Sequence, residues 1–169
     1  MPASDDDPPH VGVRIAVAPL GSALLQVVRA HAALATRWLA DVGLVPPQEL
    51  VLLFLDEHGP SPQRELVRYL GRDRSTVTAT IQAMERGGLV LRRPSGADKR
   101  ALTVELTAQG TQLCPRANEI WRRLENATFG DLDDERTSVL TAVLRQARER
   151  LAAVAENRTN PAAEQDSAQ

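Results

Sequence analysis

The sequence predicts a mainly helical fold that carries one small β-hairpin. Apolar residues recur every three or four positions through most of the chain, which is the spacing of one helix face. Residues 89–93 and 101–106 instead hold strand-like apolar and β-branched residues, and a Pro-Ser-Gly-Ala-Asp turn separates them. Hydrophobic residues make up 43% and charged residues 25% of the chain, as in ordinary globular domains. We expect one domain over residues 14–157, with disordered tails at 1–13 and 158–169.

The first helix is predicted between about residues 18 and 43. Proline suits a first helical turn, so Pro19 marks the start, and Gly43 marks the end. The apolar stripe between them consists of Leu20, Leu24, Val27, His31, Leu34, Trp38 and Val42.

Two short helices joined by a tight turn are predicted next. A helix opens at Pro46-Pro47 and must end at Gly59-Pro60, because proline lacks an N–H donor and restricts the residue before it. Ser61 is placed to cap the following helix, with Pro62 at its first position. We expect that helix to extend to Gly71.

A fourth helix is predicted from its cap, Asp73, to the Gly87-Gly88 pair. Its inward stripe consists of Val77, Ile81 and Met84, which leaves a small polar outer face. Helix, turn, helix and hairpin, in this order, form a helix-turn-helix with a β-hairpin wing, expected within residues 46–106. An α-helix fits the major groove of DNA, about 12 Å wide, and small side chains let its backbone approach.

Two further helices are predicted within residues 107–157. Thr107 can cap the first, and acidic residues 133–135 favour the positive N-terminus of the second. The apolar stripes of these helices and of the helix at 18–43 are too long to bury against one small winged core. We therefore expect both regions to associate with those of a second copy, giving a homodimer.

Positive charge is concentrated in the winged segment. The formal net charge is −2 at pH 7, yet residues 61–100 hold nine basic and four acidic side chains. A compact cationic segment inside an otherwise acidic protein attracts a polyanion while limiting nonspecific adhesion. Together with the predicted motif, this pattern indicates double-stranded DNA as a partner.

Several function classes find little support in the sequence. The longest strongly apolar run, residues 51–55, is far shorter than the about 20 residues of a membrane span, and the acidic start lacks a signal peptide's basic region. One cysteine cannot form an intrachain disulfide or a multi-thiolate metal site, and the three histidines are widely spaced. There is no nucleophile elbow and no glycine-rich phosphate loop. We expect a cytoplasmic protein that is not an enzyme, needs no cofactor or metal and contacts no membrane.

Specific motifs lie between Leu66 and Gly110. They are Leu70-Gly71-Arg72-Asp73-Arg74-Ser75-Thr76-Val77-Thr78, Met84-Glu85-Arg86-Gly87-Gly88-Leu89-Val90, Arg92-Arg93-Pro94, Asp98-Lys99-Arg100 and Leu106-Thr107-Ala108-Gln109-Gly110. This set resembles the MarR family of bacterial transcriptional regulators, whose wing signature is Asp-x-Arg followed by Leu-Thr-x-x-Gly. Outside this stretch only helix order and length agree. The resemblance implies a homodimeric winged helix-turn-helix with a dimer interface built from the N- and C-terminal helices.

The resemblance also implies which residues bind DNA. They are Arg72, Arg74, Ser75, Thr76, Thr78, Arg92, Arg93, Asp98, Lys99 and Arg100. Those at 74–78 would face the major groove, while Arg100 would enter the minor groove with Asp98 holding it. Ala79 stands where family members often carry a basic or larger residue, so base reading by this helix would rest on few side chains. For Arg92 and Arg93 the alternative is that they only solubilise an exposed hairpin.

Many family members are released from DNA by a small, often aromatic or phenolic, effector bound between the dimerisation helices and the DNA-binding lobe. His31 and Trp38 lie two turns apart on one face of the first predicted helix, so both could line such a pocket. The alternative is packing in the interface. Cys114 is a weaker candidate, for oxidation sensing, because only Arg116 supplies nearby positive charge in the sequence.

The sequence therefore predicts a DNA-binding transcriptional regulator, a repressor that binds inverted-repeat operators as a homodimer and is released by a small organic effector. The main alternative is a winged-helix module that binds protein instead of DNA. That module would bind nucleic acid without salt dependence, or not at all, and it leaves the basic wing tip unexplained. A small helical enzyme would require a catalytic pair that the sequence does not offer.

Overall fold

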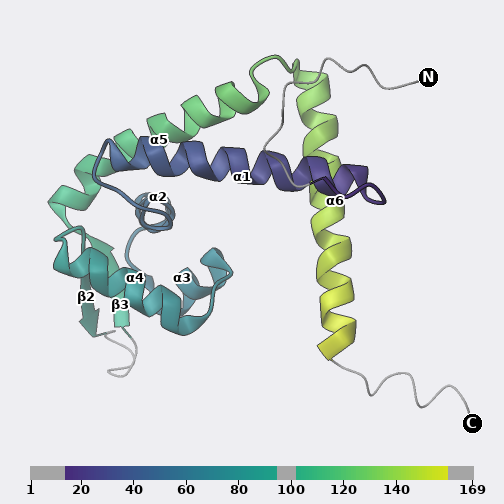
Figure 1. The fold of residues 1–169 in the computed structure, drawn as a ribbon. Helices are drawn as coiled ribbons and strands as arrows, with labels where there is room; N and C mark the ends of the chain where they lie inside the picture. Colours follow the sequence, from purple (N-terminus) through teal and green to yellow (C-terminus); the bar gives the residue numbers. More distant parts are fainter. Residues whose placement is uncertain (1–13, 95–101, 160–169) are drawn as a thin grey trace, which may run out of the picture. The chain divides into compact units, whose positions relative to one another are not determined.

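The computed structural model describes residues 14–94 and 102–159, whose helices and strands are labelled in Figure 1. In chain order the elements are α1 (Pro19–Ala40), α2 (Gln48–His58), β1 (Ser61–Pro62), α3 (Gln63–Leu70), α4 (Arg74–Arg86), β2 (Val90–Pro94), β3 (Leu102–Leu106), α5 (Ala108–Phe129) and α6 (Asp134–Thr159). The mainly helical class with a small β wing is confirmed. The chain divides into two compact units, one ending at Thr128 and the other beginning at Phe129. The first unit contains α1 to α5, and the prediction of one domain stays a prediction.

The wing is a three-stranded antiparallel sheet with the order β1-β3-β2. β2 pairs with β3 along its whole length, from Val90 opposite Leu106 to Pro94 opposite Leu102. β1 covers the other edge of β3 over two residues. The sheet thereby joins the helix-turn-helix directly to the wing.

The predicted helix cap at Ser61 was wrong. Ser61 and Pro62 form β1, and α3 begins one residue later, at Gln63. The Ser61 hydroxyl donates to the carbonyl oxygen of Gly59, at 3.0 Å, instead of accepting from a helix N–H. Pairing with β3 satisfies this backbone through the sheet, so the helix starts only where the pairing ends.

The turn between α3 and α4 follows the sequence prediction. Gly71 ends α3 with φ 59°, a left-handed conformation that glycine adopts without a Cβ penalty. Asp73 caps α4 as predicted, with its side chain accepting from the backbone N–H of Thr76.

The core of the first unit lies where the helix-turn-helix meets α5 and the C-terminal half of α1. Its most fully buried large side chains include Leu39, Leu44, Val51, Leu52, Leu66, Val77, Ile81, Met84, Val90, Val104, Cys114 and Leu124. From the fourth helix, the predicted inward stripe is buried as expected. The close-packed core therefore supports α4 and β2, which carry residues predicted to contact DNA.

Gly110 allows α5 to pack directly against the end of the helix-turn-helix. A Cβ added at Gly110 would lie 2.1 Å from the carbonyl oxygen of Leu89. Beside it, the Thr107 hydroxyl donates to the carbonyl oxygen of Gly88 at 2.6 Å, and accepts from the Gly110 N–H at 3.0 Å. The start of α5 is thereby fixed to the segment that leads from α4 into β2.

Both long terminal helices carry exposed apolar side chains. On α1 these are Leu20, Leu24, Leu25, Val27 and Val28, and on α6 they are Val139, Val143, Leu144, Leu151 and Val154. Leu20 is 85% exposed, although the sequence places it on the apolar stripe. Among the α6 residues whose burial is described none is buried, so this helix has no core of its own. In neither described stretch, 14–94 or 102–159, is a helix long and apolar enough to cross a membrane.

Candidate nucleic-acid interface

Asp73 organises the first turn of α4. Its Oδ1 accepts from the Thr76 backbone N–H at 2.8 Å and from the Ser75 hydroxyl at 2.5 Å, and its Oδ2 accepts from the Thr76 hydroxyl at 2.6 Å. These hydrogen bonds favour the charged carboxylate, and they hold the pKa of Asp73 well below its usual range although the side chain is exposed. The first turn is therefore fixed before any ligand binds.

The hydroxyl groups of α4 donate their protons within the protein. Ser75 and Thr76 donate to Asp73, and the Thr78 hydroxyl donates to the Arg74 carbonyl oxygen at 2.7 Å. What these side chains offer to a groove is oxygen lone pairs and, for the threonines, methyl groups. The sequence alone did not show this restriction.

Gln63 is a residue of this surface that the sequence reasoning missed. Its Nε2 donates to the Thr78 hydroxyl oxygen at 2.7 Å and so joins the start of α3 to the outer face of α4. No local pattern in the sequence points to this contact between two helices. The sequence prediction also placed the cap of α3 at Ser61 and gave Gln63 no role. Gln63 links the two helices through this hydrogen bond and occupies one lone pair of Thr78.

Arg72 and Arg74 flank the cap and are exposed. No ion pair holds either guanidinium to a described residue, because the intervening Asp73 is bonded to the hydroxyls of α4. Two such cations beside a positive helix N-terminus provide a favourable surface for phosphate groups. Both lie where the sequence predicted DNA contact, and that contact stays a prediction.

Arg92 and Arg93 are engaged in ion pairs on the wing. Arg92, on β2, binds Glu85 of α4 through two N–H groups, at 2.8 Å and 2.5 Å, and lowers the pKa of the Glu85 carboxyl. Arg93 pairs with Glu105 of β3 at 2.5 Å, with its side chain 67% exposed. Arg92 thus fastens the wing to α4, while Arg93 keeps much of its guanidinium open to solvent. The predicted wing residues Asp98, Lys99 and Arg100 lie outside the described residues.

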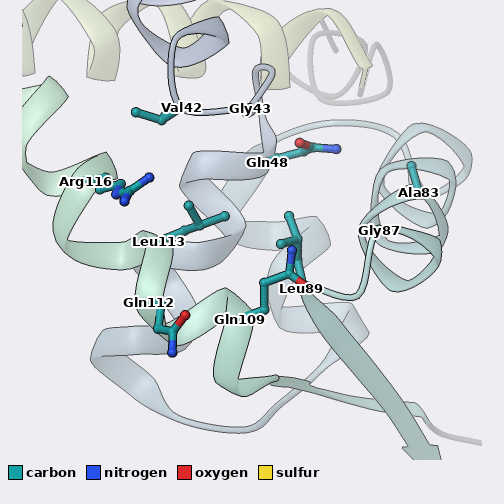
Figure 2. A pocket seen from close by; sticks show the side chains of 10 residues that line it. All are labelled: Val42, Gly43, Gln48, Ala83, Gly87, Leu89, Gln109, Gln112, Leu113 and Arg116. Carbon is teal, nitrogen blue, oxygen red and sulfur yellow. The ribbon is translucent and has the colours of Figure 1, made fainter.

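His31 and Trp38 pack against α5. The His31 ring lies 5.7 Å from the ring of Trp121, and the Arg123 guanidinium lies 4.3 Å from the centre of the Trp38 ring. The buried Nε1 of Trp121 finds no hydrogen-bond partner in the part of the chain that the structure describes. Neither His31 nor Trp38 lines the cavity of the first unit that Figure 2 shows, which lies where the end of α4 meets the start of α5.

Cys114 is buried in the core of the first unit. Its Sγ lies 3.4 Å from the carbonyl oxygen of Gly110, its neighbour one turn earlier on α5. Burial raises the pKa of this thiol to about 11, and the charge of Asp56 acts in the same direction. A neutral, inaccessible thiol is poorly suited to oxidation sensing. Among the residues with described positions, no cluster of three potential metal ligands occurs.

Comparison with known proteins places this geometry in one family. A profile of the MarR family matches residues 42–101. The transcriptional regulator YwoH of Bacillus subtilis is 36% identical over 110 residues, which cover 65% of this chain and 80% of the relative. The transcriptional repressor NicR of Pseudomonas putida is 29% identical over 122 residues, covering 72% of this chain and 77% of the relative.

Solved structures share the fold. The Bordetella bronchiseptica protein BpsR, described with regulation of its DNA binding by 6-hydroxynicotinic acid, superposes with a TM-score of 0.72 at 23% identity. The match covers 81% of this chain and 98% of BpsR. A variant of Escherichia coli MarR in complex with operator DNA gives 0.71 at 23% identity, covering 78% of this chain and 94% of that chain. The profile match, the relatives and the winged geometry agree, and the chain belongs to the MarR family of transcriptional regulators.

Proposed function

We propose that this protein is a homodimeric transcriptional repressor that binds inverted-repeat operator DNA through α4 and the wing. The observation that carries the proposal is the first turn of α4, where Asp73 fixes an exposed helix N-terminus between two arginines without ion-pair partners among the described residues. Because this turn is already ordered, its entry into a major groove loses little conformational entropy. NicR, a relative that is a named repressor, supports the direction of regulation.

Base reading by α4 combines one strong donor with several acceptors. Arg74 can donate two hydrogen bonds to the acceptors of guanine. The hydroxyl oxygens of Ser75 and Thr76 can accept from the exocyclic amines of adenine or cytosine, because their own protons go to Asp73. Threonine methyl groups suit contact with the thymine methyl group.

A homodimer explains both the exposed helices and the form of the operator. The apolar side chains exposed on α1 and α6 favour burial against a second copy. A two-fold dimer presents two α4 helices, and such dimers bind half-sites about one helical turn, 34–36 Å, apart. The protein would act in the cytoplasm, where bacterial DNA is located.

Release by a small organic effector is the second part of the proposal. BpsR, which shares the fold, is described with regulation of its DNA binding by 6-hydroxynicotinic acid. An effector lowers operator affinity only if it binds more tightly to an arrangement that cannot contact both half-sites. Small aromatic and phenolic acids, with 6-hydroxynicotinic acid among them, are the compounds to screen first.

DNA binding can be tested without knowing the operator. Genomic fragments retained by the purified protein are sequenced, and a duplex designed from them is titrated by fluorescence anisotropy over a salt series. We expect affinity to fall steeply with salt, and Arg74→Ala and Arg100→Ala each to weaken binding by about 1–3 kcal/mol. Arg122→Ala, on α5, removes an exposed arginine paired with Glu119 and should leave affinity unchanged. An affinity for DNA that changes neither with salt nor in Arg74→Ala and Arg100→Ala would favour the protein-binding alternative.

A further inference from the structure

Two adjacent arginines of β2 lie on opposite faces of the wing sheet. Successive side chains of a strand point to opposite faces, so Arg92 shares the face of Val90 and Arg93 lies on the other face. Val90 is fully buried, and so is Val104, which lies directly opposite Arg92 on β3. Arg92 therefore projects from the sheet face that packs into the core, and Arg93 projects from the outer face.

The two arginines pair with acidic residues of different elements. Glu85, in the last turn of α4, accepts from two N–H groups of Arg92, and both side chains of this pair are less than one-third exposed. Glu105, on β3, pairs with Arg93, whose side chain is 67% exposed. Among the ion pairs of the described residues, only the first joins a helix to a strand. Arg92 therefore connects the wing to α4, whereas Arg93 connects two strands within the wing.

The covalent link between α4 and β2 is short and contains two glycines. Gly87 and Gly88 follow α4 directly, and Gly88 has a φ of 70°. Glycine restricts the backbone less than any other residue, so the link itself contributes little stiffness. Figure 1 shows α4 beside β2, and the two charge-assisted hydrogen bonds from Arg92 to Glu85 join these elements across the link.

We propose that Glu85 and Arg92 are positioning residues that hold α4 and the wing at the angle DNA binding requires, and that Arg93 is left to contact a phosphate group. This inference rests on the proposed function, because it says how two DNA-contacting elements are kept in a fixed relation. The residues that connect β2 with β3 include Lys99 and Arg100, which are predicted to contact DNA beside the groove that α4 enters. A wing at the wrong angle could not make its contacts while α4 makes its own, so a fixed angle raises the affinity.

The role of Glu85 can be recognised by the sign of its effect on affinity. An acidic side chain on a DNA-binding element repels phosphate groups, so its removal ordinarily strengthens binding. Glu85→Gln removes such a charge and frees Arg92, yet loss of the fixed angle predicts weaker binding. Glu105→Gln is the matched control, because it also removes an acid and frees an arginine of β2 but breaks no contact with α4.

Fluorescence anisotropy with the operator duplex measures these variants in the full-length protein, and circular dichroism confirms the fold of each. We expect Glu85→Gln to bind about three- to tenfold more weakly than the parent, and Glu105→Gln to bind no more weakly than the parent. Arg92→Gln should match Glu85→Gln, and the double variant should be no weaker than either, because both substitutions remove the same contact. Arg93→Gln should weaken binding by the same factor in the parent and in Glu85→Gln.

Hydrogen exchange of the backbone amides tests the connection without DNA. Glu85→Gln should speed exchange both in the last turn of α4 and in β2, whereas Glu105→Gln should leave α4 unchanged. The inference is overturned if Glu85→Gln binds DNA at least as tightly as the parent, if Arg92→Gln weakens binding equally with and without Glu85, or if exchange in α4 ignores Glu85→Gln. Parent protein that binds no DNA would overturn the proposed function, and the exchange measurement would still decide whether Glu85 and Arg92 hold the wing to α4.

Discussion

Asp73 stabilises the first turn of α4 through more hydrogen bonds than a helix cap usually accepts. Three donors from the start of α4 converge on its two oxygens, so its removal releases two hydroxyl groups together with one backbone N–H. We expect Asp73→Ala to lower both the melting temperature and the operator affinity at pH 7. Asp41→Ala is the matched control, because this exposed carboxylate on α1's C-terminal side makes no side-chain hydrogen bond to a described residue.

The contribution of Asp73 to the free energy of unfolding decreases as the pH falls. The pKa of Asp73 is lower in the folded protein than in the unfolded chain, where it is near 3.8. Its stabilisation is therefore present above that value and is lost as the pH falls below it. The difference in melting temperature between parent and Asp73→Ala should be largest at pH 7 and should begin to narrow at pH 3, because the stabilisation is lost progressively from pH 3.8 down to the much lower folded-state pKa. A difference that stays constant between these pH values would show that the carboxylate charge does not stabilise the turn.

The contribution of Glu49 to stability changes with pH in the opposite direction to that of Asp73. It is 4% exposed, its Oε2 has no hydrogen-bond partner among the described residues, and burial raises its pKa above the usual 4.5. The folded protein therefore favours the protonated form, so stability is greatest below pH 4.5 and declines as the pH rises through the higher folded-state pKa. Glu49→Gln removes this decline while keeping an acceptor for the backbone N–H groups at the start of α2.

Calorimetric melts across pH 4 to 7 measure the effect of Glu49→Gln. Relative to the parent, the variant should gain a few degrees of melting temperature toward pH 7 and little at pH 4. Glu57→Gln, on the same helix and exposed, serves as the control and should follow the parent. Parallel melting curves for parent and Glu49→Gln at every pH would contradict the prediction.

At the scale of elements, close packing and hydrogen bonds constrain the junction between α4 and α5. A methyl group at Gly110 would meet the Leu89 carbonyl oxygen at 2.1 Å, a distance that requires backbone movement. We expect Gly110→Ala to cost about 1–3 kcal/mol of unfolding free energy, measured by urea denaturation. Gly21→Ala, on exposed α1 with the nearest heavy atom 3.7 Å away, should be neutral or slightly stabilising. Equal stability of the two variants would remove the packing argument.

The sequence predicted elements better than it predicted the contacts between them. Asp73 and the stripe of α4 could be predicted because caps and helical spacing are local properties. The cap at Ser61 failed because pairing with β3, more than forty residues away, decided that segment. The Gln63–Thr78 bond, the Arg92–Glu85 pair and the cavity at Arg116 all depend on distances between elements, which no local pattern contains.

At the scale of the whole molecule, the exposed apolar side chains of α1 and α6 predict that two copies of the chain form a dimer. Static light scattering at micromolar concentration should give twice the chain mass of 18.4 kDa. Leu20→Glu places a charge on a side chain that is 85% exposed in the isolated chain, so it should shift the mass toward the monomer without unfolding the first unit. Val45→Glu introduces the same charge at an exposed apolar position outside α1 and α6 and should leave the mass doubled. A monomeric parent would overturn the assembly on which inverted-repeat binding depends.

The buried thiol of Cys114 makes the chain convenient for spectroscopy. Cys114 is the single cysteine of the sequence, and both its burial and its pKa of about 11 protect it from reagents that attack the thiolate. A Leu91→Cys substitution on β2, at a side chain that is 42% exposed, would therefore supply the one readily labelled position without first replacing the native cysteine. A single fluorophore or spin label there could report the distance between the two wings of an assembled repressor as ligand or DNA is added.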